Sequence, residues 1–250
     1  MKTLFFCYLS TFSFLYSFAQ DFNAVIKEAD RLEAIPDENA AFSKFKEALK
    51  INVTNLYALS KCSELCSRIG KRQADGKLRD NYYKAAIIYA ETALKIDPNN
   101  SDANCSMAMA LGRTTMSKSG KEKINTAKDI RKYVDVALKS NPNNFKAWHV
   151  LGRWHYEISN LNFFERTFVK LFYGGLPESS LKASIAAFER SQSITSGFIL
   201  NYFELARAYH RNDEKQKAIN ALKIMLTQAN QTEDDPTTKA DGKKLLKEWE

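Results

Sequence analysis

Helix- and strand-breaking residues are scarce in this 250-residue chain, which has nine glycines and five prolines. So few breakers exclude a sandwich of many short strands joined by glycine- and proline-rich turns, and they favour long helices. Hydrophobic residues make up 44% of the chain and charged residues 26%, which is ordinary for a globular protein. The composition therefore predicts one or two folded domains of the all-α class.

Cysteine and histidine are also scarce, with four and three residues. Cys62 and Cys66 lie on one face of a predicted helix without a further Cys or His nearby, so we interpret them as packing residues. His149 and His155 do not share a helix face, and the motifs of hydrolases, zinc proteases and phosphate-binding loops are absent. We therefore expect no catalytic residue, no metal site and no cofactor.

Long apolar runs are absent except at the N-terminus. Residues 1–19 carry a positive charge at Lys2, near the start. An uncharged apolar run follows, and the segment ends in the small residue Ala19. This pattern is typical of a cleavable secretory signal, and the run is shorter than the roughly 20 residues that span a bilayer. We predict a signal peptide over 1–19 and an exported domain over 20–250, periplasmic or secreted. The alternative is an uncleaved N-terminal anchor.

The formal net charge of +8 favours anionic partners, such as acidic peptides or phospholipid headgroups. The alternative is that the charge serves only solubility. An exported protein does not meet nucleic acid, so no nucleic-acid partner is predicted.

A repeat with a period near 34 residues is the strongest positive signal, and this period is typical of tetratricopeptide helix pairs. Trp148, Leu151 and Gly152 match its W-x2-L-G pattern, in which a small residue lets two antiparallel helices approach closely. We predict an all-α, tetratricopeptide-like α-solenoid of about five helical hairpins with a C-terminal capping helix. The predicted units are residues 22–55, 56–100, 101–144, 145–198 and 199–232, and the cap is 236–250.

The second, third and fourth units are longer than the roughly 34 residues of the repeat. In each of them the additional residues lie between the two helices of the pair. We therefore expect lengthened helices in these three units, all on the same edge of the stack.

The fourth unit carries features beyond the general repeat. It contains NPN at 141–143, AWHVLGRW at 147–154, FFER at 163–166 and LP at 176–177. These stretches resemble the regulator of microtubule dynamics family, and the resemblance covers about residues 24–230.

The resemblance implies an α-helical repeat domain without catalytic residues. Animal members are associated with microtubules, spindle poles and mitochondria, and one branch resembles a lipid-binding tether at organelle contacts. The predicted export signal would separate this chain from cytosolic microtubules. We therefore expect the fold of the family to apply here, and not its association with tubulin.

The first helix of each pair should line a concave groove, and basic residues recur there in successive units. Arginine forks bind carboxylate and phosphate in a bidentate manner, so we predict that the groove captures an anionic group while Tyr156 and Phe203 pack beside it. The alternative is that the arginines pair with Glu64, Glu157 and Glu204. The predicted groove residues are Arg68, Arg113, Lys146, His149, Arg153, Tyr156, Phe203, Arg207, His210 and Arg211.

The insertion over residues 160–178 is rich in aromatic residues beside Arg166 and Lys170. Such a stripe can lie in a membrane interface or cover an acyl chain. We interpret it first as a third helix folded back into the core. The candidate membrane- or lipid-contacting residues are Phe163, Phe164, Phe168, Phe172 and Tyr173.

Two classes of function remain open. The favoured one is a non-catalytic binding or scaffold protein whose concave groove holds a peptide or protein segment with an anionic group. The alternative is a lipid-binding or membrane-contact protein.

Overall fold

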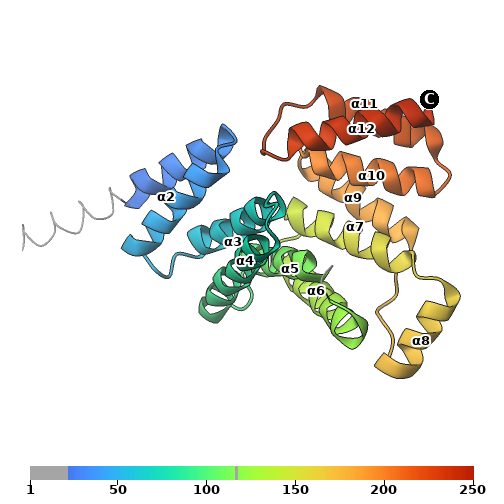
Figure 1. The fold of residues 1–250 in the computed structure, drawn as a ribbon, viewed down its shortest axis with the longest axis horizontal. Helices are drawn as coiled ribbons and strands as arrows, with labels where there is room; N and C mark the ends of the chain where they lie inside the picture. The colour runs from blue at the N-terminus through green and yellow to red at the C-terminus, as the bar shows by residue number, and fades with distance from the viewer. Residues whose placement is uncertain (1–21, 116–117) are drawn as a thin grey trace, which may run out of the picture.

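The computed structural model describes residues 22–115 and 118–250, so the predicted signal peptide lies outside the described residues. The regular elements of this part are helices, which confirms the predicted all-α class (Figure 1). A first helix spans residues 22–34. It is followed by α2 (Glu38–Ile51), α3 (Leu56–Lys71), α4 (Gly76–Ile96), α5 (Ser101–Thr114), α6 (Gly120–Ser140), α7 (Phe145–Ser159), α8 (Phe163–Tyr173), α9 (Leu181–Ile194), α10 (Ile199–Arg211), α11 (Lys215–Thr227) and α12 (Asp235–Trp249).

Successive helices pack in pairs, as the tetratricopeptide-like prediction requires. The most extensive contacts join α3 with α4, α5 with α6, α7 with α9, and α10 with α11. Figure 1 shows these hairpins following one another along a curved path.

Asparagine caps explain why three of the hairpins begin where they do. The side chains of Asn55, Asn100 and Asn144 accept the amide three residues further on, at 2.8, 3.0 and 3.0 Å. An asparagine in this position satisfies an amide that the helix itself leaves free. These caps start α3, α5 and α7 at the predicted unit boundaries.

A small residue opposite a large one brings α7 and α9 together. A Cβ atom placed on Gly152 would lie only 2.6 Å from Cδ1 of Phe188, which is fully buried. Only glycine therefore allows this close approach of the two helices. The W-x2-L-G motif thus has the steric role in this structure that the repeat pattern predicts.

Two of the three long units have lengthened helices. The second helix of the pair accounts for this, since α4 and α6 each have 21 residues. In the fourth unit the prediction of lengthened helices was wrong, because α7 and α9 have 15 and 14 residues. Its additional residues form the separate 11-residue helix α8 instead.

The predicted capping helix is confirmed as α12. Trp249 is buried there, and Leu245 and Leu246 pack against the core of the last hairpin. The ring of Trp249 stacks on His210 of α10, with centroids 4.0 Å apart. The last hairpin therefore has an apolar face that α12 covers.

The curvature of the array brings its two ends into contact. The backbone N–H of Glu38 donates to Oε1 of Glu233 at 2.8 Å, across 195 positions of sequence. Lys71 Nζ lies 3.3 Å from Oδ2 of Asp234. The loop before α12 therefore reaches α2 and the end of α3, as the loop's approach to these helices in Figure 1 shows.

Candidate functional site

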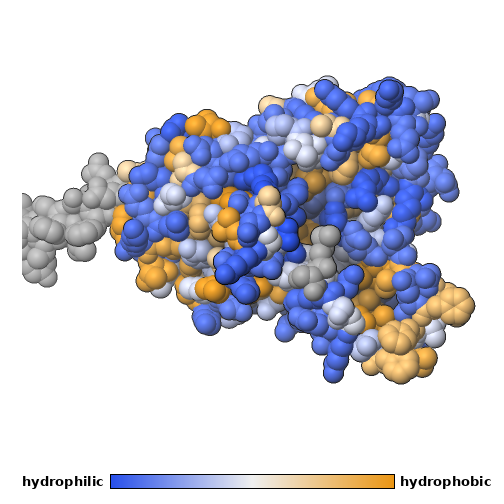
Figure 2. All heavy atoms as spheres, in the orientation of Figure 1, coloured by the Kyte–Doolittle hydropathy of each residue, from blue (hydrophilic) through white to orange (hydrophobic). Residues whose placement is uncertain are grey.

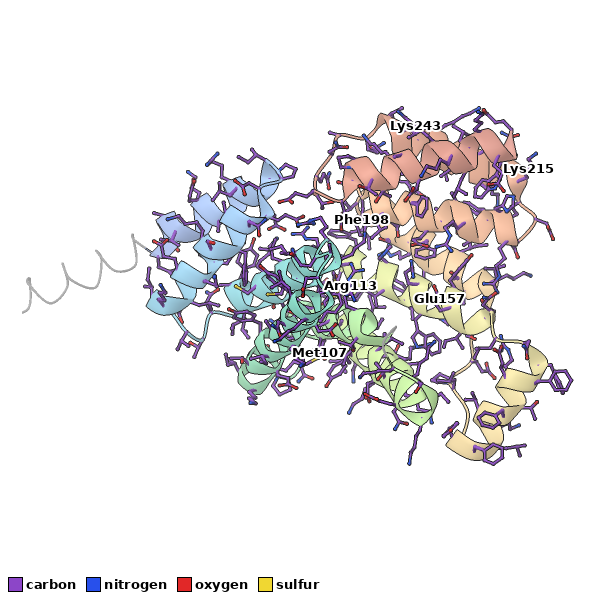
Figure 3. All side chains as sticks on the ribbon, viewed as in Figure 1. Met107, Arg113, Glu157, Phe198, Lys215 and Lys243 are labelled. Carbon is purple, nitrogen blue, oxygen red and sulfur yellow. The ribbon has the colours of Figure 1, made fainter. Side chains whose placement is uncertain are left out.

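The inner face of the array is formed by the first helices of successive pairs. α3 contacts α5, α5 contacts α7, and α7 contacts α10. Figure 2 shows the molecular surface hollowed between the N-terminal and C-terminal helices. Arg113, near the end of α5, lies in the middle of the molecule, between the N-terminal helices and α7 (Figure 3).

Close packing of these helices buries several of their small and polar side chains. Ser60, Glu64 and Ser67 of α3 are buried, and so is Cys105 of α5. Glu64 accepts a hydrogen bond from Lys146 Nζ at 2.5 Å. Lys146 is therefore already paired with a buried carboxylate. The alternative interpretation expected an arginine at Glu64, and the structure places this lysine there instead.

Arg68 is also paired. Its Nη2 lies 2.5 Å from Oε1 of Glu33, and Lys61 Nζ lies 2.7 Å from Oε2 of the same carboxylate. Burial by itself would raise the pKa of Glu33, but Lys61 and Arg68 outweigh it and lower the pKa to about 2. Glu33 is thus held as a carboxylate between two cations.

Glu204 forms the equivalent centre on the C-terminal side. This nearly fully buried carboxylate accepts hydrogen bonds from Arg153 Nη1 and, at 2.9 Å, from Arg207 Nη1. Arg153 Nη2 donates to Glu157 at 3.0 Å. The predicted alternative, in which these arginines pair with Glu157 and Glu204, is confirmed by the geometry.

Tyr156 and Phe203 lie against arginines. The guanidinium carbon of Arg207 is 5.2 Å from the ring centroid of Tyr156 and 5.9 Å from that of Phe203. Arg211 lies 4.8 Å from the Tyr156 centroid and donates to the Tyr156 carbonyl and to Ser159 Oγ, at 2.9 and 3.0 Å. These contacts fix the joint between α7 and α10.

His149 is a core residue. It is buried, and its Nδ1 lies 3.0 Å from Oδ1 of Asn201, whose amide nitrogen donates to the Phe188 carbonyl at 2.9 Å. Burial lowers the pKa of His149 to about 3, so the ring is neutral at physiological pH. The structure therefore places His149 in the joint between hairpins, and His210 against Trp249.

Arg113 differs from its neighbours because no described residue forms a hydrogen bond or ion pair with its side chain. Burial lowers the pKa of Arg113; Tyr83 and Asp234 oppose this effect, whereas Arg153 and Arg68 add to it. Arg113 is thus a partly buried cation in the positive field of two other arginines. Proximity to Asp234 could not be predicted from the repeat pattern, since it depends on the contact between the two ends.

The three cysteines in the described part of the chain are packing residues. Cys62, Cys66 and Cys105 are free and buried, and burial raises the pKa of each thiol. Within residues 22–115 and 118–250, no group of three or more His, Cys, Asp or Glu side chains could hold a metal ion. The predicted packing role of Cys62 and Cys66 is confirmed.

The aromatic insertion does not pack as predicted. Val169 is the one buried residue of α8, and the large apolar side chains around it are exposed. The interpretation of this segment as a helix folded back into the core was therefore wrong. An amphipathic stripe favours burial of the apolar face, but α8 projects from the other helices (Figure 1) and its large apolar side chains stay exposed. Among the described residues, no helix has the length and apolarity needed to cross a membrane.

Comparisons with known proteins agree with this architecture. The chain is 25% identical over 158 residues to regulator of microtubule dynamics protein 1 of Caenorhabditis elegans, covering 63% of this chain and 70% of the relative. It is 22% identical over 169 residues to the human regulator of microtubule dynamics protein 2, covering 67% of this chain but only 41% of that protein. It therefore matches less than half the length of the human relative.

The fold is shared with a solved tetratricopeptide-repeat protein of Thermus thermophilus. The two structures superpose with a TM-score of 0.63 at 15% identity, over 88% of this chain and 98% of that one. The family model for regulator of microtubule dynamics protein 1-3 matches residues 25–250. The chain belongs to the regulator of microtubule dynamics protein 1-3 family, and its fold is tetratricopeptide-like.

Proposed function

We propose that this chain is a non-catalytic scaffold whose inner face holds a peptide or protein segment through an anionic group, with Arg113 as the anchor. Family membership and the tetratricopeptide-like fold support a binding role. The observation that carries the proposal is that Arg113 has no hydrogen-bonding or ionic partner among the described residues.

The pairing of the other basic residues makes Arg113 the favoured anchor. Lys146, Arg68 and Arg153 each contact a carboxylate that is itself buried or nearly so. An incoming anion would have to displace those carboxylates. At Arg113 the anion would instead supply a partner for a partly desolvated guanidinium, whose burial without one is costly.

The geometry of the ligand follows from the arginine. A guanidinium offers two parallel N–H donors to a carboxylate or phosphate. Arg68 and Arg153 add positive potential at Arg113 without being free to form new ion pairs. We therefore expect a ligand with a single carboxylate or phosphate as its central feature, and not a long acidic run.

A peptide library displayed on phage would test the proposal. The full chain should enrich peptides that share one acidic position, and Arg113→Met should weaken binding of the enriched peptide at least about tenfold, because charge-assisted hydrogen bonds contribute roughly 1.5–3 kcal/mol. Arg190→Met, on an exposed face of α9, is the matched control and should bind normally. Equal binding by Arg113→Met, or enrichment of neutral peptides only, would refute the proposal.

We also infer that the chain acts outside the cytosol, in the periplasm or as a secreted protein. The support is the sequence of residues 1–19 alone. N-terminal sequencing of the protein recovered from cell fractions would test this, with Gln20 as the expected first residue. Recovery of the intact N-terminus from the cytosolic fraction would contradict it. The microtubule role in the names of the relatives is not part of this proposal.

A further inference from the structure

Helix α8 has an exposed apolar face for which the described part of the fold provides no cover. Five large apolar side chains of α8 are exposed. They are Phe163, Phe164, Phe168, Leu171 and Phe172, with exposed fractions of 76, 81, 50, 74 and 67%. Figure 2 shows them as an apolar patch at the end of the molecule where α8 projects. We propose that α8 docks this chain on the surface of an anionic lipid bilayer.

The helix is formed by local interactions and does not depend on core packing. Asn162 and Glu165 form a reciprocal capping box, with hydrogen bonds of 2.9 and 2.7 Å. Gly174, with φ of 71°, ends the helix in the left-handed conformation that glycine adopts without strain. Such caps allow a short helix to persist with its apolar face in water.

Polar contacts fix the orientation of α8 on the body. Lys128 Nζ of α6 donates to the Tyr173 carbonyl at 2.7 Å. Arg166 donates to the carbonyls of Leu161 and Ile158 at 3.0 and 3.2 Å. These contacts lie on the Val169 side of the helix, so the opposite, apolar side is presented outward.

Length and charge point to a lipid surface. A helix of 11 residues is about 16 Å long, too short to cross a bilayer but suited to lying in its interface. Lys170 is exposed on the same helix, and the whole chain carries +8, whereas Arg166 and Lys128 bind backbone carbonyls on the side opposite the apolar face. Exposed phenylalanine and leucine side chains with an exposed lysine on the same short helix are typical of helices that bind anionic interfaces.

The shape of the patch favours a bilayer over a second copy of the chain. The apolar side chains stand on a projecting helix, and a planar, deformable surface can receive them without a complementary groove. The inference is independent of the peptide-binding proposal, because α8 lies apart from Arg113 on the far side of α7.

Hydrogen exchange of the full chain would test the inference, using vesicles of phosphatidylcholine with and without phosphatidylserine. Backbone amides of residues 163–173 should be protected by the anionic vesicles and much less by the neutral ones. This readout is local to α8, so any effect of residues 1–19 on the vesicles leaves it interpretable.

The double variant Phe164→Ser/Leu171→Ser should reduce both this protection and α8-dependent vesicle binding at least about tenfold, because it removes two exposed apolar groups from the interface. Ile88→Ser, at an exposed position of α4, is the matched control and should leave both unchanged. Arg113→Met should also keep α8 protected, so the two proposals can fail separately.

Three results would overturn the inference. The first is absence of protection with anionic vesicles. The second is equal protection by neutral vesicles, which would remove the role of charge. The third is protection that follows protein concentration without vesicles, which would assign the patch to a second copy of the chain.

Discussion

Arg72 joins the two ends of the helical array, since its Nη2 lies 2.6 Å from Glu38 Oε2 and 3.2 Å from Glu233 Oε2. Glu38 is only 1% exposed. A buried carboxylate that loses a cationic partner is strongly destabilising, because its charge remains desolvated. We therefore expect Arg72→Met to lower the free energy of unfolding by about 3 kcal/mol in a urea titration.

Two further variants provide controls for this prediction. Glu233→Gln removes the more exposed carboxylate and should cost about 1 kcal/mol or less. Adding Glu38→Met to Arg72→Met should recover part of the loss, because the buried carboxylate then no longer remains with only the more distant Arg68, at 3.4 Å, as its cationic partner. If Arg72→Met were no more destabilising than Glu233→Gln, the buried carboxylate of Glu38 would not need Arg72 for its stabilisation.

Gly152→Ala should destabilise the protein by about 1–3 kcal/mol, because the new methyl group would overlap Phe188 in a filled core. Thermal or urea unfolding would measure the difference. Gly112→Ala is the matched helical control, since a Cβ atom at Gly112 meets nothing within 4 Å. It should stabilise by roughly 0.5–1 kcal/mol. Equal effects of the two substitutions would contradict the steric role of Gly152.

Glu33 should contribute to loss of stability in acid. Its folded pKa of about 2 lies below its ordinary value of 4.5, so the ionised group stabilises the fold above about pH 4.5. That contribution is lost as the pH falls from about 4.5 towards 2. We expect Glu33→Gln to lower stability at pH 7 by about 2–3 kcal/mol and to flatten the acid dependence in this window. If the free energy of unfolding of the wild type and of Glu33→Gln changed with pH in parallel, the pairing of Glu33 with Lys61 and Arg68 would be contradicted.

His149 should remain neutral across the physiological range. Because its folded pKa of about 3 lies below 6.5, protonation favours the unfolded chain, and His149 reduces stability as the pH falls below 6.5. Its imidazole resonances should not shift between pH 8 and pH 5 in an NMR titration. A midpoint near 6.5 in the folded protein would show that the ring is not held as described.

Local steric patterns predicted the hairpins. Gly152 opposite Phe188 acts between residues of one hairpin, so the spacing of the W-x2-L-G motif can be read in the sequence. The exposed state of α8 could not be predicted in this way. A stripe of phenylalanines identifies an apolar face but not what the face contacts.

The electrostatics of the inner face were only partly predictable. Repeat positions indicated which helices carry Arg153 and Arg113, and glutamates were recognised as possible partners. The repeat positions could not show that Glu204 would accept hydrogen bonds from both Arg153 and Arg207, because that depends on how α7 and α10 cross. Nor could they show that Arg113 would have no partner among the described residues.

The contact between Glu38 and Glu233 has a consequence for how the chain folds. An open row of repeats can fray from either end, since each unit meets only its neighbours. Here the last loop closes on the second helix, and this pairing forms only when the intervening hairpins are in place. Unfolding should therefore be more concerted than in an open array of the same length, and disruption at residues 230–234 should loosen residues 37–40 as well.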